Sequence, residues 1–324
     1  MERLQSPDRS RPLELEATLM PENAVHLAHV TKTYVSHVAV DNLTLTVPRG
    51  SIYGFIGPNG SGKTTTIRMI LHILHADSGR IEVLGQTGTR AANDRVGYLP
   101  EERGLYKKMK VSALLEYYAS LKGMRAREAR AERARWLDRM ELAAWSTKTI
   151  ESLSKGMAQK IQFIATVLTR PELIILDEPF SGLDPVNLES IKAAILDLRR
   201  QGSTIIFSTH DMGMAEAMCD SIFMIYRGRK VLDGPLEAIQ AEHGQDTIRI
   251  RTDGGIAALR DLGVVDHIRD LGEYQEVNTS LDANELLGAL LERTRVRHFE
   301  VVRPSLHDIF IKIAKPQVEE PVHA

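Results

Sequence analysis

A glycine-rich turn constrains this chain more than any other feature of its sequence. It reads Gly-Pro-Asn-Gly-Ser-Gly-Lys-Thr over residues 57–64 and fits the pattern G-x-x-x-x-G-K-[ST]. An apolar run at 52–56, typical of a strand, precedes it, and apolar residues at helical spacing follow over 64–75. A turn between a strand and a helix can bind phosphate, because its backbone N–H groups and the helix N-terminus face the same point.

The residues of this turn have separate expected roles. Lys63 is expected to reach the β- and γ-phosphates of a nucleotide, and the Thr64 hydroxyl to ligate Mg²⁺. The glycines let successive N–H groups turn inward around the phosphate oxygens. The expected nucleotide contacts of the turn are Gly57, Asn59, Gly60, Ser61, Gly62, Lys63, Thr64 and Thr65.

Two adjacent acidic residues, Asp177 and Glu178, follow a short apolar run. Residues 173–176 read Leu-Ile-Ile-Leu, which predicts a buried central strand. Ligands of open α/β sheets bind beyond the carboxyl ends of the strands, so Asp177 is expected beside the phosphate loop as a ligand of Mg²⁺ or of its water shell. Glu178 would face the γ-phosphate and orient or deprotonate the attacking water.

A histidine follows the next predicted strand. Residues 204–208 are β-rich, and Thr209, His210 and Asp211 come directly after them. If this strand lies beside the strand at 173–176, His210 also points at the γ-phosphate and can hydrogen-bond one of its oxygens. A lone histidine after a strand is more often incidental, so this prediction depends on the strand pairing.

The composition excludes several classes of protein. Apolar residues make up 43% and charged residues 26% of the 324 residues, unlike disordered or collagen-like chains. The 41 basic and 43 acidic residues give a formal net charge of −2, so there is no chain-wide basic field for nucleic acid. One cysteine cannot form an intrachain disulfide, the charged start is no secretory signal, and no run approaches the ~18 apolar residues of a membrane span. We therefore expect a cytoplasmic protein.

The order of the predicted elements indicates an α/β fold with a mostly parallel sheet. Strand candidates lie at 25–30, 43–47, 52–56, 96–99, 173–176 and 204–208, and a helix at 188–200. The helical block at 103–170 is too long for one crossover, so we interpret it as an inserted helical subdomain.

The pattern changes after Gly234-Pro235 and predicts a small α+β domain. Its expected strands lie at 246–252 and 297–303, and its helices at 256–262, 284–294 and 306–314. The chain is thus expected to divide into a flexible extension at 1–22, a main domain at 23–236, an accessory domain at 237–315 and a tail at 316–324.

Taken in order, these motifs resemble those of the ATP-binding subunits of ABC transporters. Residues 153–157, Leu-Ser-Lys-Gly-Met, are similar to that family's LSGGQ signature and precede an apolar-periodic helix. Residues 181–184, which end in Asp184, resemble the D-loop. His210 matches the switch histidine, and Tyr34 stands at the place of the aromatic residue that stacks on adenine. The resemblance covers about residues 25–235.

This resemblance implies a fold, a reaction and partners. The fold is a P-loop NTPase with an ABC-type helical subdomain, and the reaction is Mg²⁺-dependent ATP hydrolysis. Two such domains pair head to tail, as a homodimer or with a similar ATPase, and Ser154 and Gly156 of one close on the γ-phosphate held by the other. The pair would drive a separate transmembrane permease from the inner face of the cell membrane, and no nucleic-acid partner is expected.

Two departures from the family pattern mark a branch. Lys155 replaces the first signature glycine and Met157 its glutamine, while Glu101 replaces the Q-loop glutamine. Glu101 can still ligate Mg²⁺ as a carboxylate, but it would repel the γ-phosphate unless the metal lies between them. Both departures, and the segment 304–312, resemble sodium-extrusion ATPases and related ABC-2-type exporters.

Alternatives remain at this stage. One is a soluble, non-transport ABC ATPase that acts on nucleic acid or ribosomes, although such proteins usually carry two ATPase domains in one chain. Another is a regulatory module that binds nucleotide but hydrolyses little, because Glu101 and Lys155 alter the site. The Arg-rich helix at 122–139 contains Glu128, Glu132 and Asp138 and is best interpreted as a solvated face, with a surface near the membrane partner as the alternative.

Overall fold

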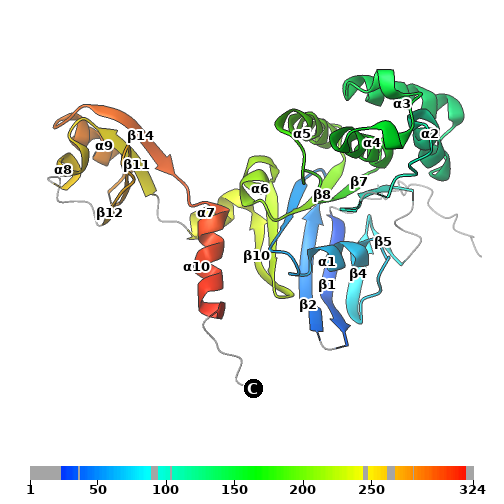
Figure 1. The fold of residues 1–324 in the computed structure, drawn as a ribbon. Coiled ribbons are helices and arrows are strands. Elements are labelled where there is room, and N and C mark those ends of the chain that lie inside the picture. Colours follow the sequence, from blue (N-terminus) through cyan, green and yellow to red (C-terminus); the bar gives the residue numbers. More distant parts are fainter. Residues whose placement is uncertain are drawn as a thin grey trace, which may run out of the picture.

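Three β-sheets organise the protein (Figure 1). The computed structural model describes residues 23–35, 37–88, 94–102, 104–243, 247–260, 267–279 and 281–318. The expected extension at 1–22 and most of the expected tail at 316–324 lie outside these residues. No helix in the described part of the chain has the length and apolar character needed to cross a membrane.

The central sheet has six strands in the order β10-β9-β3-β8-β7-β6. Its neighbours pair in parallel, except that β10 runs antiparallel to β9. Its strands are β3 (Ile52–Ile56), β6 (Val96–Leu99), β7 (Leu173–Asp177), β8 (Thr204–Thr209), β9 (Ser221–Tyr226) and β10 (Arg229–Pro235).

Both faces of this sheet are buried, which explains the continuous apolar runs of its strands. In β7, Ile174 and Leu176 join the core on one face, and Leu173 and Ile175 join the core on the other. The first face is covered by α4 (Lys155–Val167), α5 (Pro185–Arg200) and α6 (Met212–Met218). The second is covered by α1 (Lys63–Ile70) and another sheet.

That second sheet is antiparallel, so the expectation of one mostly parallel sheet was incomplete. Its order is β2-β1-β4-β5, formed by β1 (Asn23–Tyr34), β2 (His37–Pro48), β4 (Ser78–Val83) and β5 (Gln86–Thr87). β1 and β2 form a hairpin with alternating burial, as expected for strands that pack one face on a core. Short β-rich runs could not show which strands share a sheet.

Two helix boundaries differ from the sequence expectation for local reasons. The helix expected at 64–75 is α1, which ends at Ile70, and His72 then takes a left-handed φ of 54° that no α-helix accommodates. The helix expected at 188–200 is α5, which begins at Pro185. The Asp184 side chain accepts a hydrogen bond from the N–H of Asn187, and proline suits the first helical position.

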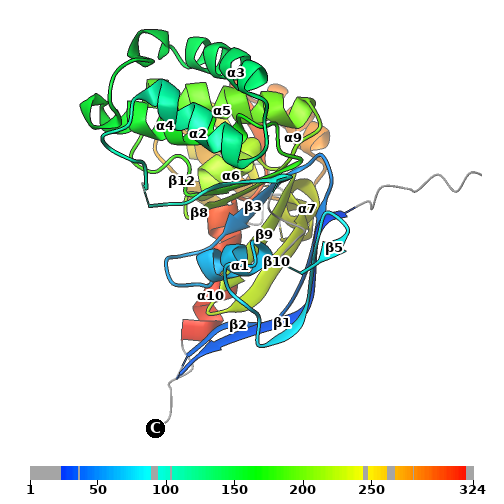
Figure 2. The same ribbon diagram turned by 90° about the vertical axis from the view of Figure 1, so that its right-hand side faces the viewer.

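The block at 103–170 is helical, as expected. It contains α2 (Val111–Leu121), α3 (Ala126–Arg139), two short 3₁₀ turns at Ala143–Trp145 and Ile150–Ser152, and α4. These helices gather at one end of the molecule, away from β1 and β2 (Figure 2). Trp136 is 1% exposed and its ring meets Phe163 edge to face, so it packs α3 onto α4.

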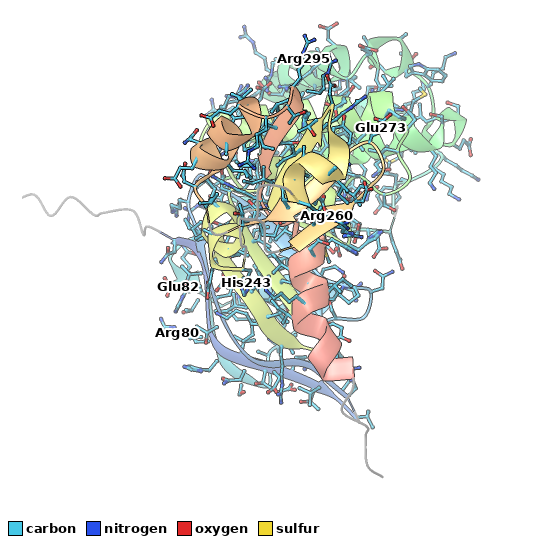
Figure 3. All side chains as sticks on the ribbon, turned by 90° about the vertical axis from the view of Figure 1, so that its left-hand side faces the viewer. Arg80, Glu82, His243, Arg260, Glu273 and Arg295 are labelled. Atoms are coloured by element: carbon cyan, nitrogen blue, oxygen red, sulfur yellow. The ribbon has the colours of Figure 1, made fainter. Side chains whose placement is uncertain are left out.

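The third sheet forms a separate small unit of α+β type. Its elements are β11 (Thr247–Thr252), α8 (Gly255–Arg260), β12 (His267–Asp270), β13 (Gln275–Asn278), α9 (Ala283–Leu291) and β14 (Val296–Val302). The strand order β12-β13-β11-β14 is antiparallel throughout. Ile248, Ile250 and Leu286 belong to a core of its own. Charged side chains such as Arg260, Glu273 and Arg295 belong to this unit (Figure 3).

Two helices that flank this unit pack against the main domain instead. They are α7 (Leu236–His243) and α10 (Leu306–Val318). Leu306 and Ile309 of α10 are fully buried in the same core as α6, and the N–H of Leu306 donates to the Glu216 carboxylate on α6. The small sheet is therefore attached to the main domain through elements on both sides of it.

Candidate active site

The phosphate loop has a shape that only glycine permits at two points. It leaves β3, whose five residues are all buried between β8 and β9, and enters α1 at Lys63. Gly57 has φ 153° and Gly62 has φ 113°, and both are closely covered. A Cβ on Gly57 would lie 2.2 Å from the carbonyl oxygen of Ile225, and one on Gly62 2.5 Å from that of Ala39. The loop is thus fixed against the β9 end and the β2 strand.

Lys63 holds the loop closed from inside. Its ammonium donates to the carbonyl oxygens of Gly57 at 2.6 Å and Pro58 at 3.1 Å, and the residue is 6% exposed. Burial lowers the pKa of Lys63, while the nearby carboxylates Glu178, Asp177 and Glu101 act in the opposite direction. A cation held at this point can reach phosphate oxygens that enter the loop.

Asp177 ends β7 with one oxygen satisfied and one without a partner. Ser208 on the neighbouring β8 donates its hydroxyl to Oδ1. Oδ2 is buried and has no hydrogen-bond partner among the described residues, and the side chain as a whole is 2% exposed. A buried, unpartnered carboxylate oxygen is costly, and a hard cation such as Mg²⁺ or its water shell would satisfy it.

Glu178 and His210 lie in direct contact. β7 and β8 are parallel neighbours, with Asp177 opposite Ser208, which is the pairing on which the His210 prediction depended. His210 Nδ1 lies 2.9 Å from Glu178 Oε1. The Glu178 backbone has a φ of 49°, and its N–H donates to the Ser208 hydroxyl at 3.1 Å. Strained backbone held by hydrogen bonds is frequent where a side chain must be aimed at a ligand.

One cavity of about 380 Å³ collects most of the predicted contacts. It is lined by Tyr34, His37, Ala39, Asn59, Gly60, Ser61, Gly62, Lys63, Thr64, Thr65, Glu101, Asp177 and Glu178. His37 and Ala39 were not predicted. The turn between two β-rich runs was the one sequence feature that could have pointed to them. Their place in the cavity depends on the fold, in which His37 of β2 pairs with Tyr34 of β1.

Comparison with known proteins agrees with this geometry. A family model described as "ABC transporter" matches residues 40–181. An uncharacterized ABC transporter ATP-binding protein of Bacillus subtilis is 43% identical over 287 residues, which are 88% of this chain and 96% of that protein. The chain belongs to the family of ABC transporter ATP-binding proteins. It is an ATPase with the P-loop fold of that family.

Other matches cover both the main domain and the C-terminal segment of the chain. A model described as "ATP-binding protein DrrA1-3-like, C-terminal domain" matches residues 234–314. Daunorubicin resistance ATP-binding protein DrrA3 of Streptomyces coeruleorubidus is 34% identical, over 71% of this chain and 74% of that protein. Nod factor export ATP-binding protein I of Paraburkholderia xenovorans is 31% identical, over 93% and 100%. None of these relatives is described as acting on nucleic acid.

A solved ATP-binding subunit of an ABC transporter has the same fold. It superposes with a TM-score of 0.64 at 28% identity, over 68% of this chain and 92% of its own. The similarity supports the α/β fold expected from the sequence, with the small α+β unit added after it.

The signature segment of this ABC protein lies outside the phosphate cavity. Ser154 caps α4 by accepting a hydrogen bond from the N–H of Met157 at 3.3 Å. A Cβ on Gly156 would lie 2.7 Å from the Asn187 side-chain nitrogen, so glycine allows α4 to approach α5 closely. Asp184 caps α5, and its hydrogen bonds from Asn187 lower its pKa. Ser154, Gly156 and Asp184 therefore lie together, at the adjoining starts of two helices.

A second cavity, also of about 380 Å³, adjoins the same carboxylates. Glu101, Asp177 and Glu178 line both cavities, and Lys155, Gln159 and Gln162 of α4 line the second. Gln162 donates to the carbonyl oxygens of Pro100 and Glu102, at 3.5 and 3.3 Å. Gln159 donates to that of Pro179 at 2.6 Å. No local motif marks these two glutamines, which fix the segments that carry Glu101 and Glu178.

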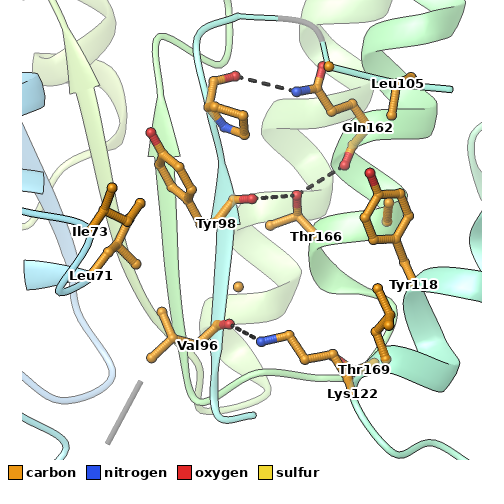
Figure 4. A pocket seen from close by; sticks show the side chains of 15 residues that line it. Leu71, Ile73, Val96, Tyr98, Leu105, Tyr118, Lys122, Gln162, Thr166 and Thr169 are labelled. Carbon is orange, nitrogen blue, oxygen red and sulfur yellow. Dashed lines mark hydrogen bonds between the residues drawn. The ribbon is translucent and has the colours of Figure 1, made fainter. Parts of the chain in front are cut away.

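A third hollow of about 440 Å³ opens between β6 and the helices α2 and α4 (Figure 4). Its lining is mostly apolar and includes Ile73, Leu105, Tyr118 and Leu121. Lys122 donates to the carbonyl oxygen of Val96 at 3.1 Å across its lower end. Gly104 and Leu105 belong to this lining, and the next residue, Tyr106, is exposed.

Proposed function

We propose that this ABC ATPase powers an exporter. Support comes from its relatives, which include a daunorubicin resistance protein and a Nod factor export protein, and from the C-terminal segment that matches the DrrA-like domain. ATP would be hydrolysed between two copies of the chain, or between this chain and a similar ATPase. The resulting movement would be passed to a separate transmembrane permease, which would hold this chain at the inner face of the membrane.

Within each site, Lys63 and the loop N–H groups hold the phosphates, and the adenine stacks on Tyr34. Glu178 orients the attacking water and accepts its proton, while His210 steadies the Glu178 carboxylate and contacts the γ-phosphate. The unpartnered oxygen of Asp177 and the hydroxyl of Thr64, with Glu101 beside them, would hold Mg²⁺. Bound Mg²⁺ would neutralise part of the phosphate charge.

The dimer accounts for the residues that lie outside the cavity. Ser154, Gly156 and Asp184 present a helix N-terminus at the surface, where it can meet the phosphate held by the partner copy. Neither copy then has a complete site alone. Binding of ATP would close the dimer, and hydrolysis would open it.

The apolar hollow between β6, α2 and α4 is the surface that suits a permease. Exposed apolar side chains surround it, with Ile73 58%, Leu121 60% and Tyr106 55% exposed. A short amphipathic helix from the cytoplasmic side of the permease would bury them. Because Gln162 lines both this hollow and the second cavity, movement of the helix can reach Glu101.

The contact between Glu178 and His210 supports the hydrolysis step of this proposal, because the Glu178 carboxylate lines the cavity of the phosphate loop and could act there as a base. The test is to purify the tagged chain from its native membranes in mild detergent and measure ATPase activity of what is recovered. A stoichiometric multi-span protein, with ATP hydrolysis that requires Mg²⁺, is the expected result. Recovery of only soluble partners or nucleic acid would contradict the transport role.

A further inference from the structure

Three carboxylates of this site share their two cavities with two lysines. Glu101, Asp177 and Glu178 line both the phosphate cavity and the second cavity. Lys63 lines only the first and Lys155 only the second. Lys63 is already engaged by two carbonyl oxygens of its loop. Before a nucleotide or metal binds, the repulsion among the carboxylates therefore has two cationic neighbours to oppose it, one in each cavity.

Lys155 reaches the site of its own chain. It is the first residue of α4, and its Nζ would lie 3.0 Å from a Cβ built on Gly182, in the loop that follows Glu178. The described residues that line the second cavity include neutral polar groups, such as Gln159 and Ser181, but no second cation. The lysine thus lines the same cavity as the carboxylates, a cavity that Lys63 does not line.

The position of Lys155 on its helix is unfavourable by itself. The N-terminus of a helix carries a partial positive charge, so a lysine in the first turn is repelled by the helix that holds it. α4 has no acidic residue in that turn to offset this repulsion. The carboxylates that line the same cavity would supply negative charge near this lysine.

We propose that Lys155 is the counter-charge of Glu101 in the nucleotide site of the same chain and sets its affinity for ATP. The proposal rests on the nucleotide site described above. It differs from the dimer role of the signature segment, where residues 154–156 act on the nucleotide of the partner. With Lys155 in place, three carboxylates face two ammonium groups. Without it the site repels the phosphates more strongly, and without the Glu101 charge it repels them less.

The test compares four full-length proteins: the wild type, Lys155→Gln, Glu101→Gln and the double variant. ATP affinity is measured by titration in EDTA, so that a metal-ligand role of Glu101 cannot contribute. Protein concentrations are chosen at which light scattering shows a monomer, so that only contacts within one chain count. Lys155→Arg tests whether charge alone is sufficient, and Lys148→Gln, an exposed lysine of the helical subdomain, is the matched control.

Lys155→Gln is expected to weaken ATP binding about three- to fivefold, and Glu101→Gln to strengthen it by a similar factor, as for charges in a partly solvated cavity. The double variant and Lys155→Arg should return close to the wild type, and the shifts should shrink at high salt. Unchanged affinity of the Lys155→Gln monomer would overturn the proposal, as would shifts of the same sign in both single variants. If the wild type fails to bind ATP, or Lys63→Ala binds it equally well, the nucleotide-site assignment fails instead.

Discussion

The imidazole of His210 lies against the carboxylate of Glu178, with 2.9 Å between Nδ1 and Oε1. The two residues end neighbouring parallel strands, and the Ser208 hydroxyl connects the same strands by donating to Asp177 and accepting from the Glu178 N–H. Glu178 is 9% exposed at its side chain and His210 59%. The geometry therefore fixes the Glu178 carboxylate, which we propose as the base, and leaves much of the His210 side chain exposed.

Glu178→Gln is expected to reduce ATP hydrolysis by at least ~100-fold while ATP binding is kept, because the amide preserves the contact shape but cannot accept a proton. Steady-state ATPase and equilibrium ATP binding check this. Glu189→Gln, on the exposed face of α5, should leave both unchanged. Hydrolysis at the wild-type rate in Glu178→Gln would show that another group is the base.

Gly57→Ala should destabilise the protein more than Gly60→Ala. Both glycines have positive φ, so both substitutions carry about 1–2 kcal/mol of backbone strain. Only the Cβ on Gly57 also collides, at 2.2 Å, with the Ile225 carbonyl oxygen, whereas the Gly60 position is open. Denaturant unfolding of the two variants checks the difference. Equal midpoints would mean that the loop can shift away from β9.

Leu306→Ala should increase local unfolding of α6, although Leu306 is about 90 residues away from this helix in the sequence. Leu306 is fully buried against the main core, and a Leu→Ala change at such a site costs roughly 2–5 kcal/mol. Because α6 begins two residues after His210, hydrogen exchange of the amides at 212–218 is the direct measurement. Ile311→Ala, on the exposed side of α10, is the control. Unchanged exchange in Leu306→Ala would show that α10 does not support α6.

Glu132→Gln should reduce stability at neutral pH by about 1–3 kcal/mol and flatten its decline in acid. Burial alone would raise the pKa of Glu132, but hydrogen bonds from Arg170 and Arg135 outweigh it and hold the pKa below its ordinary value. A depressed pKa means that the stabilisation is present above the unfolded value, about 4.3, and is lost as pH falls through the folded value.

Unfolding by denaturant between pH 7 and pH 3 tests this, with the exposed Glu128→Gln in the same helix as control. A parallel pH profile for wild type and Glu132→Gln would contradict the assigned role. The expectation of a solvated face for this Arg-rich helix was wrong at Glu132, whose side chain is 7% exposed and pairs with Arg135 at 2.7 Å.

The phosphate loop and the acids at the strand ends could be predicted from the sequence alone. The glycines and the lysine of the loop lie within residues 57–63, and Asp177 and Glu178 directly follow an apolar run, so each group can be identified from its own local pattern. The order of these motifs also indicated the family, and comparison confirmed it. The position of His210 followed once β8 was placed beside β7.

Contacts between segments far apart in the chain became known only from the tertiary structure. The antiparallel sheet, the second cavity and the return of α10 to α6 each join segments far apart in the chain. Lys155 faces carboxylates on two other segments, and Glu132 is buried by Arg170 from beyond α4. The hydrophobic effect is non-directional and favours contact between any apolar surfaces that fit together. Which segments pack against each other therefore depends on the whole fold and is not encoded in a local sequence pattern.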